Sequence, residues 1–221
     1  MKNINTFEYW DRRFSSGDWE EKKGREQTLA FAEEQVARLE LKKSFSGTIL
    51  DFGCGLGDAM LPYRKAYPDA KLIGVDFSMQ AIAKCRQKYA HLATFIVGSF
   101  GDIPAVDVIV SSNVFEHLSD DESIANSLLK KCQRLFIIVP YKESLKAAVE
   151  HEHVNSYDEA SFSSLPCLRK EVFFSAGLTG LNWAKILYQV WFKNIFRWVI
   201  RRKIAKHVPQ REILFEFKGE L

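Results

Sequence analysis

The sequence predicts an α/β protein with a doubly wound, mostly parallel sheet. Short apolar runs alternate with segments of helical periodicity, a pattern typical of strands connected by helices that cover both faces of a sheet. An acid and three glycines follow the first apolar run, and a second acid follows the next run. Because ligands of open α/β sheets bind at the carboxyl ends of the strands, these residues predict a ligand site at that edge.

The expected elements follow one another between residues 26 and 139. Ser46 and Gly47 break the first helix, Pro68 ends the second, and Pro140 ends the fifth strand. Ser78 has the side chain of a helix N-cap. The expected helices cover 26–41, 59–67, 78–89 and 120–131, and the expected strands cover 48–50, 71–75, 94–97, 106–110 and 135–139.

The end of the chain departs from this alternation. Residues 178–187 and 212–218 are expected to form an antiparallel closing pair of strands, with a basic and aromatic helical insertion at about 186–208 between them. We therefore expect two parts in the chain. Residues 1–46 form a helical cover, and residues 47–221 form the ligand-binding domain.

Charge is distributed unevenly along the 221 residues. Residues 172–211 contain eight Lys and Arg residues and no Asp or Glu, so the remainder carries 23 basic and 28 acidic residues. The body is thus mildly acidic, and we expect no DNA partner. The N-terminus is polar, and the four cysteines form no C-x-x-C pair, which predicts a cytoplasmic protein without a disulfide framework or a zinc site.

The segment ILDFGCGLGDAM at 49–60 indicates what the ligand is. Asp51 ends a strand and the glycines permit a tight turn and a close approach by a ligand. A dinucleotide site has the spacing G-x-G-x-x-G and binds pyrophosphate, which Asp51 would repel. Asp51 suits a positive amino group, and Asp76 can accept hydrogen bonds from two ribose hydroxyls. S-adenosylmethionine (SAM) has an amino group, a sulfonium, a ribose and no phosphate, so these residues favour SAM over NAD.

In these motifs the chain resembles the class I SAM-dependent methyltransferase superfamily, in the small-molecule branch similar to ubiquinone-biosynthesis-type O-methyltransferases. The resemblance covers residues 48–140 and implies a Rossmann-like, seven-stranded sheet whose last strand is antiparallel. The segment 107–118 matches the motif that passes beneath the transferable methyl group. The N-terminal segment resembles the arm that covers the active site in relatives, where Arg12, Arg13 and Arg25 could meet a carboxylate of SAM or of an acidic substrate.

The resemblance also implies roles for individual residues. The first acid and the glycine loop would hold the methionine part of SAM, the second acid the ribose, and two phenylalanines and a serine the adenine. Core packing is the alternative for the phenylalanines, and a buried structural thiol is the alternative for the cysteine. The candidate cofactor-binding residues are Asp51, Gly53, Cys54, Gly55, Gly57, Asp76, Phe77, Ser99, Phe100 and Asn113.

Methyl transfer from a sulfonium needs alignment above all, but an oxygen nucleophile still benefits from a general base. The candidate catalytic residues are Glu116, His117, His151 and His153, each of which could instead be an ordinary polar loop residue. Some small-RNA 3′-end methyltransferases hold a divalent ion with a Glu-x-x-Glu-His stretch and a later histidine. Here Asn113 replaces the first acid, so no metal is assigned, although Glu116, His117 and a later histidine could converge.

We therefore expect a SAM-dependent methyltransferase that releases S-adenosylhomocysteine (SAH). Its acceptor is expected to be a small molecule or a glycan or lipid-linked precursor, methylated on a hydroxyl. One alternative is a regulatory protein that binds SAM without chemistry, and another is a metal-assisted RNA 2′-O-methyltransferase. The polar residues beneath the methyl group favour an enzyme. The sequence leaves open the acceptor, the methylated atom and the oligomeric state.

The segment 186–206 has three interpretations. As a helix it places Gln189, Lys193, Arg197 and Arg201 on one stripe, and it is too charged to span a bilayer. It could pack on the domain, form a subunit interface, or lie on an anionic membrane surface, because basic residues beside Trp and Phe suit such a surface. The last interpretation predicts a peripheral contact with the inner face of the membrane.

Overall fold

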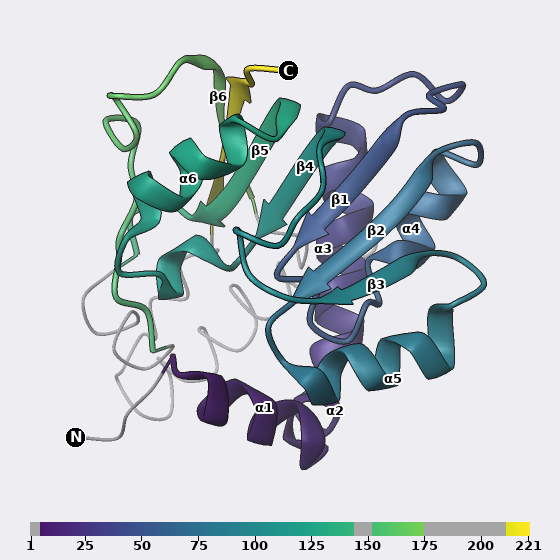
Figure 1. The fold of residues 1–221 in the computed structure, drawn as a ribbon. Helices are drawn as coiled ribbons and strands as arrows, with labels where there is room; N and C mark the ends of the chain where they lie inside the picture. Colours follow the sequence, from purple (N-terminus) through teal and green to yellow (C-terminus); the bar gives the residue numbers. More distant parts are fainter. Residues whose placement is uncertain (1–4, 144–151, 175–210) are drawn as a thin grey trace, which may run out of the picture.

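The computed structural model describes residues 5–143, 152–174 and 211–221 (Figure 1). Seven strands form one sheet in the order β3-β2-β1-β4-β5-β7-β6. The first five strands are parallel, and β7 runs antiparallel to both of its neighbours. The expected fold class is thus confirmed. The strands are β1 (Thr48–Phe52), β2 (Lys71–Asp76), β3 (Thr94–Val97), β4 (Val106–Ser112), β5 (Cys132–Pro140), β6 (Cys167–Phe174) and β7 (Arg211–Lys218).

Helices cover both faces of the sheet. On one face, α3, α4 and α5 pack against a core that includes Tyr63, Ile82 and Phe136. On the other face, α6 and the segment 157–165 pack against a second core that includes Phe115 and Phe215. The helices are α1 (Phe7–Ser15), α2 (Asp18–Glu21), α3 (Gly24–Arg38), α4 (Met60–Ala66), α5 (Met79–Tyr89) and α6 (Asp121–Leu129), with a 3-10 turn η1 (Phe115–His117) after β4.

Central strands are buried on both faces, which explains why they read as continuous apolar runs. In β1, Ile49 belongs to one core and Leu50 to the other. Ser78 caps α5 as expected, because its Oγ accepts a hydrogen bond from the backbone N–H of Ala81 at 3.0 Å. The expected helices and strands between residues 26 and 139 are present, with ends that differ by a few residues.

The closing strands differ from the expectation. The partner of β7 is β6, which lies earlier in the chain than the expected strand at 178–187. The side chains that β6 turns toward α3 include Arg169 and Glu171, which pair with Glu216 and Arg38. Because paired charges replace apolar residues on this face, β6 lacks the alternation that predicts a strand. The expected strand at 178–187 and the insertion at 186–208 lie outside the described residues.

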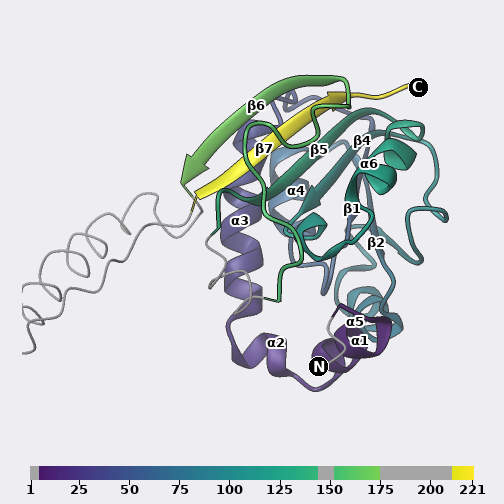
Figure 2. The same ribbon diagram turned by 90° about the vertical axis from the view of Figure 1, so that its left-hand side faces the viewer.

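Helices α1 and α2 lie across the edge of the sheet where the parallel strands end, while α3 runs along the sheet (Figure 2). Asp11 of α1 fastens this cover to α5. Its Oδ1 accepts hydrogen bonds from Ser78 Oγ at 2.7 Å and from the backbone N–H of Gln80 at 3.1 Å. Lys84 adds a hydrogen bond to the carbonyl of Phe14 at the end of α1. The first two helices therefore close over the carboxyl edge of the sheet.

The loop after β1 requires glycine at position 53. Gly53 has φ of +79°, and a Cβ atom there would lie 2.4 Å from Cγ2 of Val114. Both the backbone conformation and the contact exclude a side chain. The loop is therefore fixed against the segment that follows β4.

We predict that Gly53→Ala lowers the free energy of unfolding by about 1–3 kcal/mol, because it adds backbone strain and a steric contact. Urea denaturation measures this change. Gly101→Ala is the matched control, because its Cβ atom would meet nothing closer than 3.9 Å. Equal stability of the two variants would show that the loop does not depend on glycine at this position.

Candidate active site

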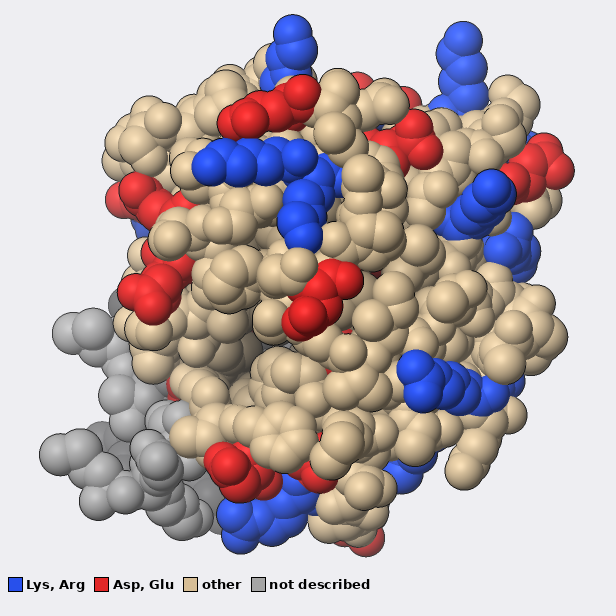
Figure 3. All heavy atoms as spheres, viewed as in Figure 1, with Lys and Arg blue, Asp and Glu red and all other residues tan. Residues whose placement is uncertain are grey.

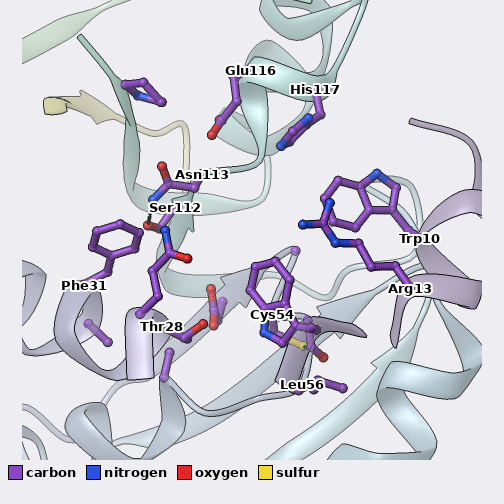
Figure 4. A pocket seen from close by; sticks show the side chains of 18 of the residues that line it. Trp10, Arg13, Thr28, Phe31, Cys54, Leu56, Ser112, Asn113, Glu116 and His117 are labelled. Atoms are coloured by element: carbon purple, nitrogen blue, oxygen red, sulfur yellow. Dashed lines mark hydrogen bonds between the residues drawn. The ribbon is translucent and has the colours of Figure 1, made fainter. Parts of the chain in front are cut away.

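A cavity of about 470 Å³ lies at the carboxyl edge of the sheet, beneath α1 and α2 (Figure 4). Its walls come from the cover, from α3, from the loops after β1 and β4, and from residues 152–153. The cavity thus lies at the edge of the sheet where the sequence predicts a ligand site. Asp51, Gly53, Cys54, Gly55, Asn113, Glu116, His117 and His153 are the predicted site residues that line it.

Asp51 is the acid best placed to meet a cation. It is 6% exposed, lines the cavity, and receives no hydrogen bond to its carboxylate from any described residue. Burial, and then the nearby charge of Asp76, raise the pKa of Asp51 to about 7. A positive amino group in the cavity would supply the missing partner. This carboxylate therefore fits the amino group of SAM.

Asp76 has a structural role in addition to the predicted one. Its Oδ2 accepts the backbone N–H of Gly55, and its Oδ1 accepts that of Ser78, both at 2.9 Å. Asp76 does not line the cavity, but each carboxylate oxygen has a further lone pair. Binding of the ribose hydroxyls by Asp76 stays a prediction.

The loop residues between these acids are packed tightly. Cys54 is buried, and its thiol and that of Cys85 both approach the carbonyl of Gly55. Gly57 does not line the cavity, and a Cβ atom there would lie 2.9 Å from the sulfur of Cys85. These two predicted residues therefore support the loop from beneath, and the structural alternative accounts for the thiol of Cys54.

The predicted adenine residues lie outside the cavity, at the carboxyl ends of β2 and β3. Phe77 and Phe100 are each 38% exposed, so core packing does not account for them. Ser99 donates its backbone N–H and its hydroxyl to Asp102 Oδ2, at 2.9 and 3.1 Å. Asp102, the nearest acid to this segment, was not among the residues predicted from the sequence. Contact between these residues and adenine stays a prediction.

Three of the predicted catalytic residues converge. One ligand atom from each of Glu116, His117 and His153 lies within 4.8 Å of the others, and all three side chains line the cavity. Glu116 and His117 come from η1 after β4, and the backbone N–H of Val154 joins the histidine loop to the carbonyl of Glu116 at 2.8 Å. His151 lies outside the described residues.

A glutamate that the sequence analysis missed orients His153. Nδ1 of His153 lies 2.5 Å from Oε2 of Glu143, and its Nε2 lies 3.9 Å from Oε1 of Glu116. All three side chains are at least 90% buried. Because the carboxylate of Glu143 fixes one ring nitrogen, the other is directed toward Glu116. Only its position shortly after β5 could have indicated Glu143, since no motif contains it.

Burial shifts the pKa values of the other two residues of the cluster, Glu116 and His117. It raises the pKa of Glu116 well above its usual value, and Oε2 of this side chain has no hydrogen-bond partner. Burial, and then His153, lower the pKa of His117 to about 4. His117 therefore stays neutral near pH 7, with Nδ1 at 3.3 Å from the carbonyl of Glu152 and its ring against that of Trp10.

Of the three arginines proposed for the cover, Arg13 lines the cavity. Its guanidinium lies over the rings of Trp10 and Trp19, and its Nε has no hydrogen-bond partner. Arg25 instead pairs with Asp58 at 3.3 Å. Arg13 is thus the arginine placed to meet a carboxylate in the cavity.

Comparison with known proteins finds similarity to methyltransferases. Residues 49–136 match the family model described as a methyltransferase domain, and this family uses SAM as methyl donor. The ribosomal RNA small subunit methyltransferase H of a Nitratiruptor species is 29% identical over 131 residues. That match covers 55% of this chain and 42% of the relative, so the chain spans less than half of the relative's length.

Solved structures of methyltransferases share the fold. One is the methyltransferase in a complex with the Haloferax volcanii Trm112 methyltransferase activator, with a TM-score of 0.69 and 16% identity over 96% of this chain and 98% of that one. Another is the plantazolicin methyltransferase BpumL in complex with SAH, with a TM-score of 0.58 and 16% identity over 99% of this chain and 97% of that one. These likenesses show that the chain shares the fold of these two structures.

The pKa of Asp51 predicts how SAH binding depends on pH. Below about pH 7 the carboxyl is protonated and loses its attraction for the amino group of SAH, so affinity should rise as the pH increases from 6 to 7.5. Calorimetry at both values measures the change. Asp51→Asn keeps the shape of the side chain and should bind more weakly, with no such rise. A rise of equal size in Asp51→Asn would assign it to another group.

Proposed function

Because the chain contains a methyltransferase domain whose family uses SAM, we propose that it transfers the methyl group of SAM to a hydroxyl of a small-molecule acceptor. One observation carries this proposal. The cluster of Glu116, His117 and His153 lines the same cavity as Asp51 and the glycine loop. A group that can remove a proton and a site for a cationic cofactor therefore share one cavity.

Asp51 and the loop from Gly53 to Gly57 would hold the methionine part of the cofactor, and Arg13 can meet its carboxylate. The free carboxylate of Asp51 and the guanidinium of Arg13 supply opposite charges on the cavity wall. When bound, SAM supplies an electrophilic methyl group, and the electrons of the broken carbon–sulfur bond leave with SAH. The cover of α1 and α2 limits the access of water to this space.

His153 is the general base in this proposal. Its Nε2 would take the proton of the acceptor hydroxyl while an oxygen lone pair forms the new bond to carbon. Glu143 holds the opposite nitrogen and stabilises the positive ring that results. His117 is a weaker candidate, because a pKa of about 4 makes its ring a poor proton acceptor at neutral pH.

A divalent metal ion is the second candidate for activating the hydroxyl. Glu116, His117 and His153 offer three ligand atoms within 4.8 Å of one another, and a neutral imidazole and a carboxylate are suitable ligands. The unpartnered Oε2 of Glu116 would also gain a partner. In this version the three residues would hold the ion, and the ion would lower the pKa of the acceptor hydroxyl.

Neither a regulatory protein nor an RNA enzyme is favoured. A protein that only binds SAM has no need for three convergent proton-binding groups in the cavity. RNA binding relies on basic surface, and Figure 3 shows Lys and Arg interspersed with Asp and Glu on the face it presents. Small-molecule methylation therefore remains the proposal.

We predict that His153→Ala lowers methyl transfer by on the order of a hundredfold and leaves the affinity for SAH unchanged. The assay follows tritiated methyl groups from SAM into a fractionated small-molecule extract. His91→Ala, at an exposed histidine, is the control. Full activity of His153→Ala would reject this base. Activity that EDTA abolishes and Mg²⁺ restores would assign the cluster to a metal ion instead.

We further propose that the protein contacts an anionic membrane surface. Among the described residues, no helix is long and apolar enough to cross a bilayer. The segment 186–206 lies outside the described residues, but its flanking residues Phe174 and Arg211 are paired at the end of the sheet. Val172 and Phe174 are 37% and 54% exposed at the end of β6 that precedes this stretch in the chain.

Cosedimentation with vesicles tests this contact. We expect binding that rises with the fraction of anionic lipid and falls with salt, because basic residues are attracted to the surface charge. Replacing Trp191 and Trp198 by Ser should weaken it, and vesicles of neutral lipid are the control. Protein that stays in the supernatant with anionic vesicles at low salt would contradict the proposal.

A further inference from the structure

The wall of the cavity beside the catalytic cluster contains mostly neutral polar side chains. Thr28 and Gln35 of α3 and Ser112 and Asn113 at the end of β4 line the cavity, together with the ring of Phe31 (Figure 4). With Asp51 and the glycine loop assigned to the cofactor, we assign this wall, which we call the amide wall, to the acceptor, and Asn113 with it, although the sequence placed Asn113 among the cofactor-binding candidates. Its free hydrogen-bonding atoms therefore indicate what the acceptor must offer.

Ser112 can act toward a ligand only as a donor. Its Oγ already accepts hydrogen bonds from Nε2 of Gln35 at 2.5 Å and from Nδ2 of Asn113 at 3.1 Å. These two bonds occupy both lone pairs of the hydroxyl. The hydroxyl hydrogen is not used by any described residue.

The other three polar residues of the amide wall present acceptors. Thr28 donates its hydroxyl hydrogen to the carbonyl of Gly24 at 2.9 Å, which leaves the lone pairs of Oγ1. The second hydrogen on Nδ2 of Asn113 goes to Glu212 Oε1 at 3.3 Å, and this bond orients the amide.

The amide oxygens of Gln35 and Asn113 receive no hydrogen bond from a described residue. Neither oxygen is among the fully buried atoms that lack a partner, so both are accessible from the cavity. Even with the second N–H of Gln35 counted, free acceptors outnumber free donors along the amide wall.

The cations near the cavity do not reverse this balance. Lys22 pairs with Asp18 at 2.9 Å, and Arg13, which is assigned to the carboxylate of the cofactor, also lies 3.7 Å from both Asp18 and Glu152. A carboxylate or phosphate on the acceptor would have to place its oxygens against the acceptor oxygens of the amide wall. An anionic acceptor would therefore lose hydrogen bonds to water without replacing them.

From this balance, and resting on the proposed methyl transfer, we propose that the acceptor is an uncharged, polyhydroxylated ring such as a sugar or a cyclitol. Its hydroxyls donate to Thr28, Gln35 and Asn113, and one of them accepts from Ser112. The ring of Phe31 offers an apolar surface to the C–H face of the acceptor. A simple phenol would satisfy a single member of the amide wall.

Saturation-transfer NMR tests the proposal on the full-length protein loaded with SAH. The probes are methyl glucoside, methyl mannoside and myo-inositol, mixed with succinate, citrate and catechol at equal concentration. We expect transfer to the ring protons of at least one of the first three. Stronger transfer to the carboxylates or to catechol, or none to the three polyols, would overturn the proposal.

Matched variants test whether the polyol binds to the amide wall. Thr28→Val removes the acceptor oxygen at constant volume and should weaken binding of the polyol about three- to tenfold, whereas Thr28→Ser should retain it. Gln35→Leu should act in the same direction, and Thr28→Val decides the question if Gln35→Leu is unstable. Equal affinity of Thr28→Val and wild type would contradict the assignment.

Calorimetry with SAH separates this inference from the proposed function. A protein that does not bind SAH would refute the proposed function and this inference with it. A protein that binds SAH but no polyol would refute the inference alone.

Discussion

The buried carboxylate of Asp76 connects the glycine loop, the start of α5 and the cover of the cavity. It accepts backbone N–H groups from Gly55 in the glycine loop and from Ser78 at the start of α5. Ser78 in turn donates to Asp11 of α1, so three segments distant in sequence are joined through one buried acid. The shape of the cavity and the position of its cover follow from this connection. Loss of Asp76 would therefore disturb the site even if no ribose ever touched it.

The cavity also contains buried acids that lack a cationic partner. Burial raises the pKa of Asp51 to about 7 and that of Glu116 well above its usual value. Each of these acids is held in an unfavourable environment that a cation or a proton would relieve. A cofactor with an amino group and a sulfonium suits such an environment, whereas a pyrophosphate does not. This explains why an acid before the glycines distinguishes SAM from a dinucleotide.

The sequence predicted the parts of the fold that are set by local patterns. Glycines, proline stops and continuous apolar runs located the strands and the loop after β1, and strand ends located Asp51 and Glu116. It could not predict contacts between segments distant in sequence. Glu143, which follows β5, contacts His153 only because the loop that contains His153 lies at the same edge of the sheet. The amide of Gln35 donates to Ser112 from α3, a helix in which no sequence motif marks this residue. Strand β6 was missed because charged pairs replace its apolar face.

A crystal structure with SAH bound would show whether one cavity holds both the methyl donor and the group that activates the acceptor. We expect the amino group of SAH to contact Asp51 and its sulfur to face the space between His153 and the amide wall. SAH bound with its sulfur directed away from His153, or with its amino group remote from Asp51, would show that the donor and the activating group do not act together in this cavity.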